Sequence, residues 1–137
     1  MAITPEQKAL ALHRFQRAEE TLSEAADALA QKNFRLSINR AYYSIFYAMR
    51  GFLATVNKDS SKHSGVISIF NQYIIKPGIV PEVSFKAIQI LMDLRHEADY
   101  KDFAETSQEE ASAAMEAAKK IMNDFKIHLD RLIQSTE

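Results

Sequence analysis

Apolar residues recur along most of the chain at the spacing that places them on one side of an α-helix. The apolar stripes run over residues 10–29, 34–56, 66–74, 85–95 and 111–132. A polar break over residues 56–64 and a Pro77-Gly78 turn interrupt the pattern. We therefore expect four long helices and one short helix, joined by short loops.

Capping residues precede several of these stripes. Thr4, Pro5 and Gln7 have the pattern of an N-cap, a proline at the first helical position and a capping box. Ser107 and Glu110 form a second capping box. Two further helix starts are expected at Asn33 and Pro81. The pattern predicts an all-α fold, an up-and-down helical bundle that spans residues 1–137 as a single domain.

Composition agrees with helices and narrows the chemistry. Glycine and proline number three each, which is few for the many turns of a strand-rich fold. The absence of cysteine excludes a disulfide framework, a thiolate metal site and a cysteine nucleophile. No apolar run approaches the ~20 residues that span a bilayer, and the first residues lack a basic-then-apolar signal. We expect a cytoplasmic protein that does not act at a membrane.

Charge is distributed unevenly, although the net charge is only −1. Residues 32–63 hold six lysines and arginines and one acid, whereas residues 97–116 hold seven acids and one base. The two segments are expected to attract each other within the fold or across a dimer. A basic patch that meets an anion is the alternative, and the asymmetry alone favours the first interpretation.

The helix expected at 34–56 has a second, partly apolar face, formed by Leu36, Arg40, Tyr43, Tyr47 and Ala54. This face either pairs with a second copy or a partner, or is covered by the short helix at 64–75. Its tyrosines either fill the core or stack a base while Arg40 holds a phosphate. The sequence leaves both choices open.

Several common kinds of site are not supported by the sequence. The four histidines lie far apart and form no i,i+4 pair, so we expect no metal site. A glycine-rich phosphate loop and a nucleophile elbow are both missing from the sequence. We expect no cofactor.

Arg95 stands at the end of the fourth apolar stripe, over residues 85–95. A charge at such a position must be paired, or must face a cavity or an interface. Asp99 is its i,i+4 neighbour and would form an ion pair with it. The residues alone therefore indicate a polar cluster around Arg95 in a helical protein that forms oligomers.

Three blocks carry a resemblance to a known family. They are "INRAYYSIFYAMRGFL", "SKHSGVISIFNQYIIKPG" and "LRHEADYKDF", in this order. Together they look like the HEPN domain (higher eukaryotes and prokaryotes nucleotide-binding), most of all its small stand-alone prokaryotic branch, over roughly residues 8–132. The resemblance implies a helical bundle that is often dimeric. It also implies a metal-independent endoribonuclease toxin, or a protein that binds nucleotide or RNA without cutting it. Stand-alone members often accompany a minimal nucleotidyltransferase antitoxin.

The motif of active members is an arginine, usually followed by a polar residue, with a histidine after four to six intervening residues. Arg95 matches the arginine and His96 matches the polar residue. The histidine position falls on Tyr100, Lys101 or Asp102. Metal-free RNA cleavage needs a base and an acid, roles that suit imidazole near neutral pH and suit tyrosine poorly.

The resemblance thus implies a toxin-like homodimer that binds RNA or nucleotide, has weak or absent nuclease activity and works with a nucleotidyltransferase. The expected binding residues are Arg40, Tyr43, Tyr47, Arg95, Asp99 and Tyr100. One alternative is an active endoribonuclease that uses Arg95 and His96. Another is a structural or adaptor bundle in which Arg95 and Asp99 only fix helix packing. Tyr100 would be the acceptor if the partner transfers adenylate to a tyrosine near the motif.

Overall fold

The computed structural model describes residues 2–101 and 105–135, and within them the chain is helical and contains no strand. The elements in chain order are α1 (Pro5–Ala30), α2 (Phe34–Thr55), α3 (His63–Phe70), η1 (Asn71–Ile75), α4 (Glu82–Tyr100) and α5 (Gln108–Gln134). The all-α class, with four long helices and a short one, is confirmed. The short helix predicted at 64–75 consists of α3 followed directly by one π-helical turn, η1.

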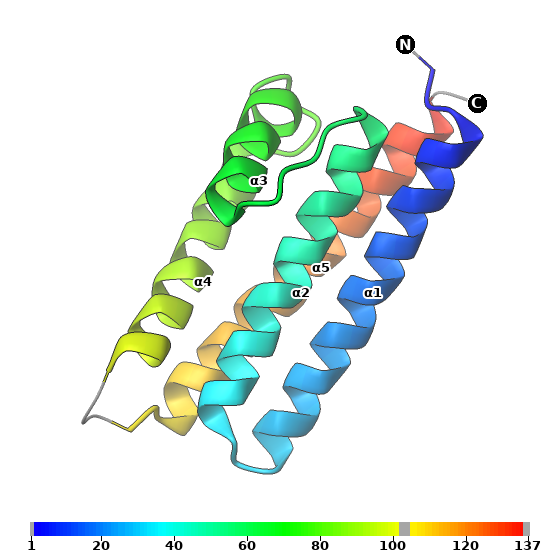
Figure 1. Ribbon diagram of the computed structural model, residues 1–137. Coiled ribbons are helices and arrows are strands. Elements are labelled where there is room, and N and C mark those ends of the chain that lie inside the picture. The colour runs from blue at the N-terminus through cyan, green and yellow to red at the C-terminus, as the bar shows by residue number, and fades with distance from the viewer. Residues whose placement is uncertain (1, 102–104, 136–137) are drawn as a thin grey trace.

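The four long helices lie side by side in an up-and-down arrangement (Figure 1). α1 begins and α5 ends at the same end of the bundle (Figure 1). α2 is the central element, because it contacts α1, α3, η1, α4 and α5. The loop after α2 runs back along that helix before α3 begins, so the first residue of α3 lies beside the middle of α2 (Figure 1).

The predicted helix starts are present. The Thr4 side chain accepts a hydrogen bond from the Gln7 backbone N–H at 3.1 Å, and the Gln7 side chain accepts one from the Thr4 N–H at 2.8 Å. The same reciprocal pair joins Ser107 and Glu110 at the start of α5. Each capping box satisfies backbone donors that would otherwise lack a partner at a helix start.

Four phenylalanines connect the core across the bundle. The ring of Phe52 on α2 lies 6.2 Å from Phe15 of α1, 5.8 Å from Phe70 of α3 and 5.2 Å from Phe125 of α5. Edge-to-face packing at such distances adds to the apolar burial of these rings. The core therefore fixes α1, α3 and α5 around α2.

The buried face of α1 begins one residue later than the apolar stripe over residues 10–29. Leu10 is 42% exposed, whereas Ala11 is fully buried, and the face continues through alanines and Phe15. A Cβ at Gly51 would lie 3.2 Å from the backbone oxygen of Ala11 and 3.3 Å from Phe15. The small residues therefore face inward because α1 and α2 approach too closely for leucine at that level.

None of the helices in residues 2–101 and 105–135 is long and apolar enough to cross a membrane.

Candidate functional site

Arg95 extends from α4 onto the aromatic face of α2. Its guanidinium carbon lies 4.9 Å from the ring centroid of Tyr42 and 5.5 Å from that of Tyr43. A cation at this distance from an aromatic ring is attracted by the ring's electrons, and more strongly where water is excluded. The Arg95 side chain keeps 27% of its surface exposed, so solvent and ligands still reach it.

The predicted ion pair between Arg95 and Asp99 is present, with Nε of Arg95 2.9 Å from Oδ2 of Asp99. Its geometry is not that of an aligned hydrogen bond. A second contact, from a terminal guanidinium nitrogen to the Tyr43 hydroxyl, is long at 3.5 Å. A guanidinium has several N–H donors, so Arg95 retains donors for an incoming anion.

His63 completes this group of residues, although it is not among the residues predicted from the sequence. Its ring lies 4.4 Å from that of Phe46 and 5.5 Å from that of Tyr43. Burial lowers the pKa of His63, and the nearby charge of Arg95 lowers it further. We call this group the Arg95 cluster, and its members are Arg95, Asp99, Tyr42, Tyr43 and His63.

His63 lies in one of the three blocks that carry the family resemblance, but no local spacing connects it to Arg95. The residue follows a polar loop, and its partners stand on the preceding helix. Only the path of that loop, which runs back along α2, brings the imidazole to the rings that also contact Arg95 (Figure 1).

The second face of α2 continues from the Arg95 cluster in both directions. Arg40 lies over the Tyr43 ring at 5.3 Å, and two of its nitrogens donate to the side-chain oxygen of Asn39. The rings of Tyr43 and Tyr47 are 6.1 Å apart, and Arg17 of α1 lies over Tyr47 at 5.8 Å. Tyr43 and Tyr47 are half-buried, because α3 covers this face only in part. Arginines and tyrosines therefore alternate along an accessible face.

His96 and Tyr100 occupy another side of α4. Both are exposed, Tyr100 at 70%, and their rings pack on each other at 4.5 Å. Among the described residues, the ring contacts of His96 lead to Tyr100 and not to the Arg95 cluster. The structure thus brings together Arg40, Tyr43, Tyr47, Arg95 and Asp99 from the predicted set and places His96 and Tyr100 apart from them. Asp102, a possible position of the motif histidine, lies outside the described residues.

Few polar contacts join the basic segment (residues 32–63) to the acidic segment (residues 97–116). Arg35 donates to the backbone oxygen of Lys101 at 3.2 Å. Arg50 instead pairs with Asp59 of its own segment at 2.8 Å, and Lys101 pairs with Glu110 at 3.3 Å. Within the described residues, no ion pair joins the two segments. Much of the basic segment's charge therefore remains available to an external anion.

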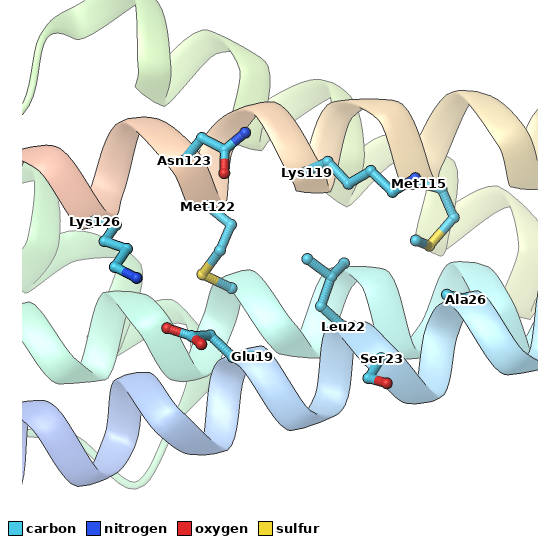
Figure 2. Close-up of a pocket in the computed structure, with 9 residues that line it drawn as sticks. All are labelled: Glu19, Leu22, Ser23, Ala26, Met115, Lys119, Met122, Asn123 and Lys126. Carbon is cyan, nitrogen blue, oxygen red and sulfur yellow. The ribbon is translucent and has the colours of Figure 1, made fainter.

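A groove between α1 and α5 offers a different kind of surface. It has a volume of about 390 Å³, and Leu22 and Met122 point into it from the two helices (Figure 2). Glu19 of α1 lines it together with Lys119 and Lys126 of α5. None of the described residues that line it is aromatic or an arginine, so it lacks the rings that stack bases and the guanidinium groups that bind phosphate through two parallel hydrogen bonds. Among the described residues, no three metal-ligating side chains of the His, Cys, Asp and Glu types gather anywhere.

These observations define a small all-helical bundle with an arginine held on an aromatic face. The HEPN domain model matches residues 11–128, so the chain belongs to the HEPN family. The chain is 37% identical over 100 residues to the Methanocaldococcus jannaschii protein named "Putative toxin MJ0605", with 73% of this chain and 75% of that protein covered. It is 30% identical over 117 residues to a UPF0332 protein of Thermotoga maritima, with 80% and 89% covered.

Proposed function

We propose that this protein is a toxin-like HEPN protein that binds single-stranded RNA at the Arg95 cluster and has weak or absent nuclease activity. The proposal rests on the contacts that the Arg95 guanidinium makes. The guanidinium lies on two tyrosine rings, has one carboxylate partner and retains donors toward solvent. The name of the M. jannaschii relative supports the toxin-like part of the proposal.

The neighbouring residues suit this ligand. Exposed parts of Tyr43 and Tyr47 can stack bases, which is the sequence-tolerant way in which proteins hold single strands. Arg95 and Arg40 can bind the phosphates that connect those bases. Asp99 orients Arg95, because its carboxylate holds the Nε side of the guanidinium.

A second candidate, a metal-independent endoribonuclease, is supported by the position of His63. Cleavage requires a group that removes the proton of the 2′-hydroxyl and a group that protonates the leaving oxygen. His63 contacts the same rings as Arg95, and its lowered pKa favours the neutral imidazole that acts as a base. His96, the histidine proposed from sequence, is the other candidate for this role.

The partners belong to the proposal as well. In a homodimer, Arg95 residues of two protomers would hold one RNA between them. A minimal nucleotidyltransferase would act as antitoxin, and Tyr100 is exposed enough to serve as its acceptor. The Tyr100 phenolate would attack the α-phosphorus of ATP, and pyrophosphate would leave as the tyrosyl–AMP bond forms. Incubation with the transferase and ATP should add one adenylate to the intact mass of the wild type and none to Tyr100→Phe.

The central experiment measures RNA binding and cleavage by the wild type, Arg95→Ala and Arg131→Ala. Arg131 is an exposed arginine in the last turn of α5, so its loss is a matched change of charge outside the site. We expect Arg95→Ala to weaken RNA binding by about tenfold or more, because a charged hydrogen bond is lost. Arg131→Ala should bind like the wild type. Equal RNA binding by all three proteins, with a lower melting temperature for Arg95→Ala alone, would instead support a structural or adaptor bundle.

A further inference from the structure

A pocket of about 400 Å³ opens between α1 and α2, beside the second face of α2. We call it the Arg14 pocket, and it is lined by Leu10, His13, Arg14, Arg17, Tyr47 and Arg50. None of the described residues that line it carries a carboxylate. Three guanidinium groups and an aromatic ring in one concave site are the groups that bind phosphates and stack bases.

Charge in the Arg14 pocket is only partly balanced. Asp59 pairs with Arg14 at 3.0 Å and with Arg50 at 2.8 Å, so one carboxylate serves two guanidinium groups. In the part of the chain that the structure describes, no carboxylate forms an ion pair with Arg17. Three positive charges and one negative charge therefore leave an excess of two positive charges at this pocket.

The arginines are held in place before any ligand arrives. Arg14 donates to the backbone oxygen of Arg50 at 2.9 Å, and its side chain is only 16% exposed. This contact depends on the close approach of α1 and α2 at Gly51, where an added Cβ would meet the backbone of Ala11. Burial lowers the pKa of Arg14, and the charge of Arg50 lowers it further. The hydrogen bond to Asp59 leaves the pKa of Arg50 above its ordinary value, whereas the pKa of Arg14 stays lowered. Asp59 therefore offsets the burial of Arg14 beside Arg50 only in part, and a bound anion would offset more of it.

Tyr47 connects the Arg14 pocket to the Arg95 cluster. Its ring lines the pocket, contacts Arg17 at 5.8 Å and lies 6.1 Å from Tyr43 on its other side. Tyr43 in turn contacts Arg95. Tyr43 and Arg50 are two helical turns apart, or about 10 Å along the axis, so a strand of a few nucleotides reaches both sites.

We propose that the Arg14 pocket binds a phosphate of the same single-stranded RNA that occupies the Arg95 cluster, with a neighbouring base stacked on Tyr47. This inference rests on the proposed RNA-binding function and extends the site from α4 and α2 to α1. Arg17 is the contact that closes the pocket around the phosphate, whereas Arg14 and Arg50 form its fixed wall. The site is then a continuous track of arginines and tyrosines rather than an isolated cluster.

The test compares two oligouridines, one of about two nucleotides and one of about eight, because single-strand sites cover at least several nucleotides. Fluorescence anisotropy gives the affinity of each for the wild type, Arg17→Ala, Arg95→Ala and Arg131→Ala across a range of salt concentrations. Arg17 is exposed, so its replacement leaves the core intact. Equal melting temperatures of the wild type and Arg17→Ala would confirm that the core is intact.

We expect Arg17→Ala to weaken binding of the long oligouridine about tenfold and that of the short one little. The slope of log K against log salt for the long oligouridine should fall in magnitude by about 0.7, the value for one phosphate contact on a single strand. Arg95→Ala should weaken binding of both. If only Arg95→Ala weakens binding and Arg17→Ala matches Arg131→Ala, the proposal that the Arg14 pocket binds RNA is wrong, and the proposed function is retained. If the wild type binds neither oligouridine, both the proposed RNA-binding function and the proposal for the Arg14 pocket are wrong.

Discussion

The guanidinium of Arg95 on α4 lies 4.9 Å from the ring centroid of Tyr42 on α2. Tyr42 is only 3% exposed, and its ring is fixed by stacking on Phe46 and by edge contact with Tyr43. Burial also raises the pKa of its phenol, so the contact is one between a cation and a neutral ring. A buried ring thus sets the position of a charge that reaches solvent.

Replacement of Tyr42 by leucine should therefore impair RNA binding without removing any charge. We expect Tyr42→Leu to lower RNA affinity severalfold, because the cation–ring attraction of about 1 kcal/mol no longer holds Arg95. Loss of the ring should also lower the free energy of unfolding by about 1–3 kcal/mol. Tyr42→Phe keeps the ring and is the control. Unfolding in urea and RNA titration give the two quantities, and loss of RNA binding in Tyr42→Phe would contradict this explanation.

The pKa of His63 depends on its burial and on the nearby charge of Arg95. Burial and the charge of Arg95 both lower its pKa, so the midpoint in the folded protein should lie below 6.5. Arg95→Ala should raise this midpoint, whereas Arg131→Ala should leave it unchanged. NMR of the imidazole ring during a pH titration measures it. An unchanged midpoint in Arg95→Ala would show that the two groups are not coupled.

The lowered pKa of His63 also makes the free energy of unfolding depend on pH. A histidine whose pKa is lower in the folded state binds fewer protons there than in the unfolded chain. Stability is therefore undiminished above about pH 6.5 and decreases as the pH falls through the folded pKa. The charged and titratable groups that face His63 are Arg95 of α4 and the phenols of Tyr42 and Tyr43 of α2. His63→Gln should reduce this part of the pH dependence in urea unfolding.

Local signals were sufficient to predict most of the fold. The capping boxes at Thr4 and Ser107 involve residues three positions apart, so the sequence displays them directly. The apolar stripe of α1 begins at Leu10, but the close approach at Gly51 places Ala11 in the core instead. Tertiary packing decides such a choice, and no stripe on a single helix reveals it.

The site was harder to predict than the fold, for the same reason. Arg95 was recognisable because a charge on an apolar stripe is unusual, and its partner Asp99 lies one turn away. His63 and Arg14 depend on the return of a loop along α2 and on the packing of α1 against α2. Their contacts join distant parts of the chain, so no local spacing in the sequence reveals those contacts.

Asp59 should contribute to stability in a pH-dependent manner. The hydrogen bond from Arg50 is the main cause that lowers its pKa to about 2, from an ordinary value of 3.8. The contribution is therefore present above about pH 3.8 and is lost as the pH falls toward 2. Because its side chain is 42% exposed, we discount the effect for solvent screening to about 1 kcal/mol. Asp59→Asn should lose this amount at pH 7 and little at pH 2 in urea unfolding. An equal loss at both pH values would point to packing instead of charge.

Gly51→Ala should destabilise the bundle, although alanine favours helices by about 1 kcal/mol over glycine. Its Cβ would lie 3.2 Å from the backbone oxygen of Ala11, which cannot move without displacing α1. We expect a net loss of about 1–2 kcal/mol in the free energy of unfolding. Ser23→Ala, at an exposed position of α1, is the control for helix propensity and should not destabilise. A Gly51→Ala variant as stable as the wild type would show that the two helices separate easily.

Any metal-independent cleavage of RNA, however slow, should depend on Arg95 and on His63 rather than on His96. His63 shares the Tyr42 and Tyr43 rings with Arg95, so one scissile phosphate can reach both side chains. The contacts of His96 lead instead to the exposed Tyr100. We expect cleavage in the presence of a chelator to be lost in His63→Gln and retained in His96→Gln, with RNA binding preserved in both. Cleavage that survives in His63→Gln and disappears in His96→Gln would assign the base to His96.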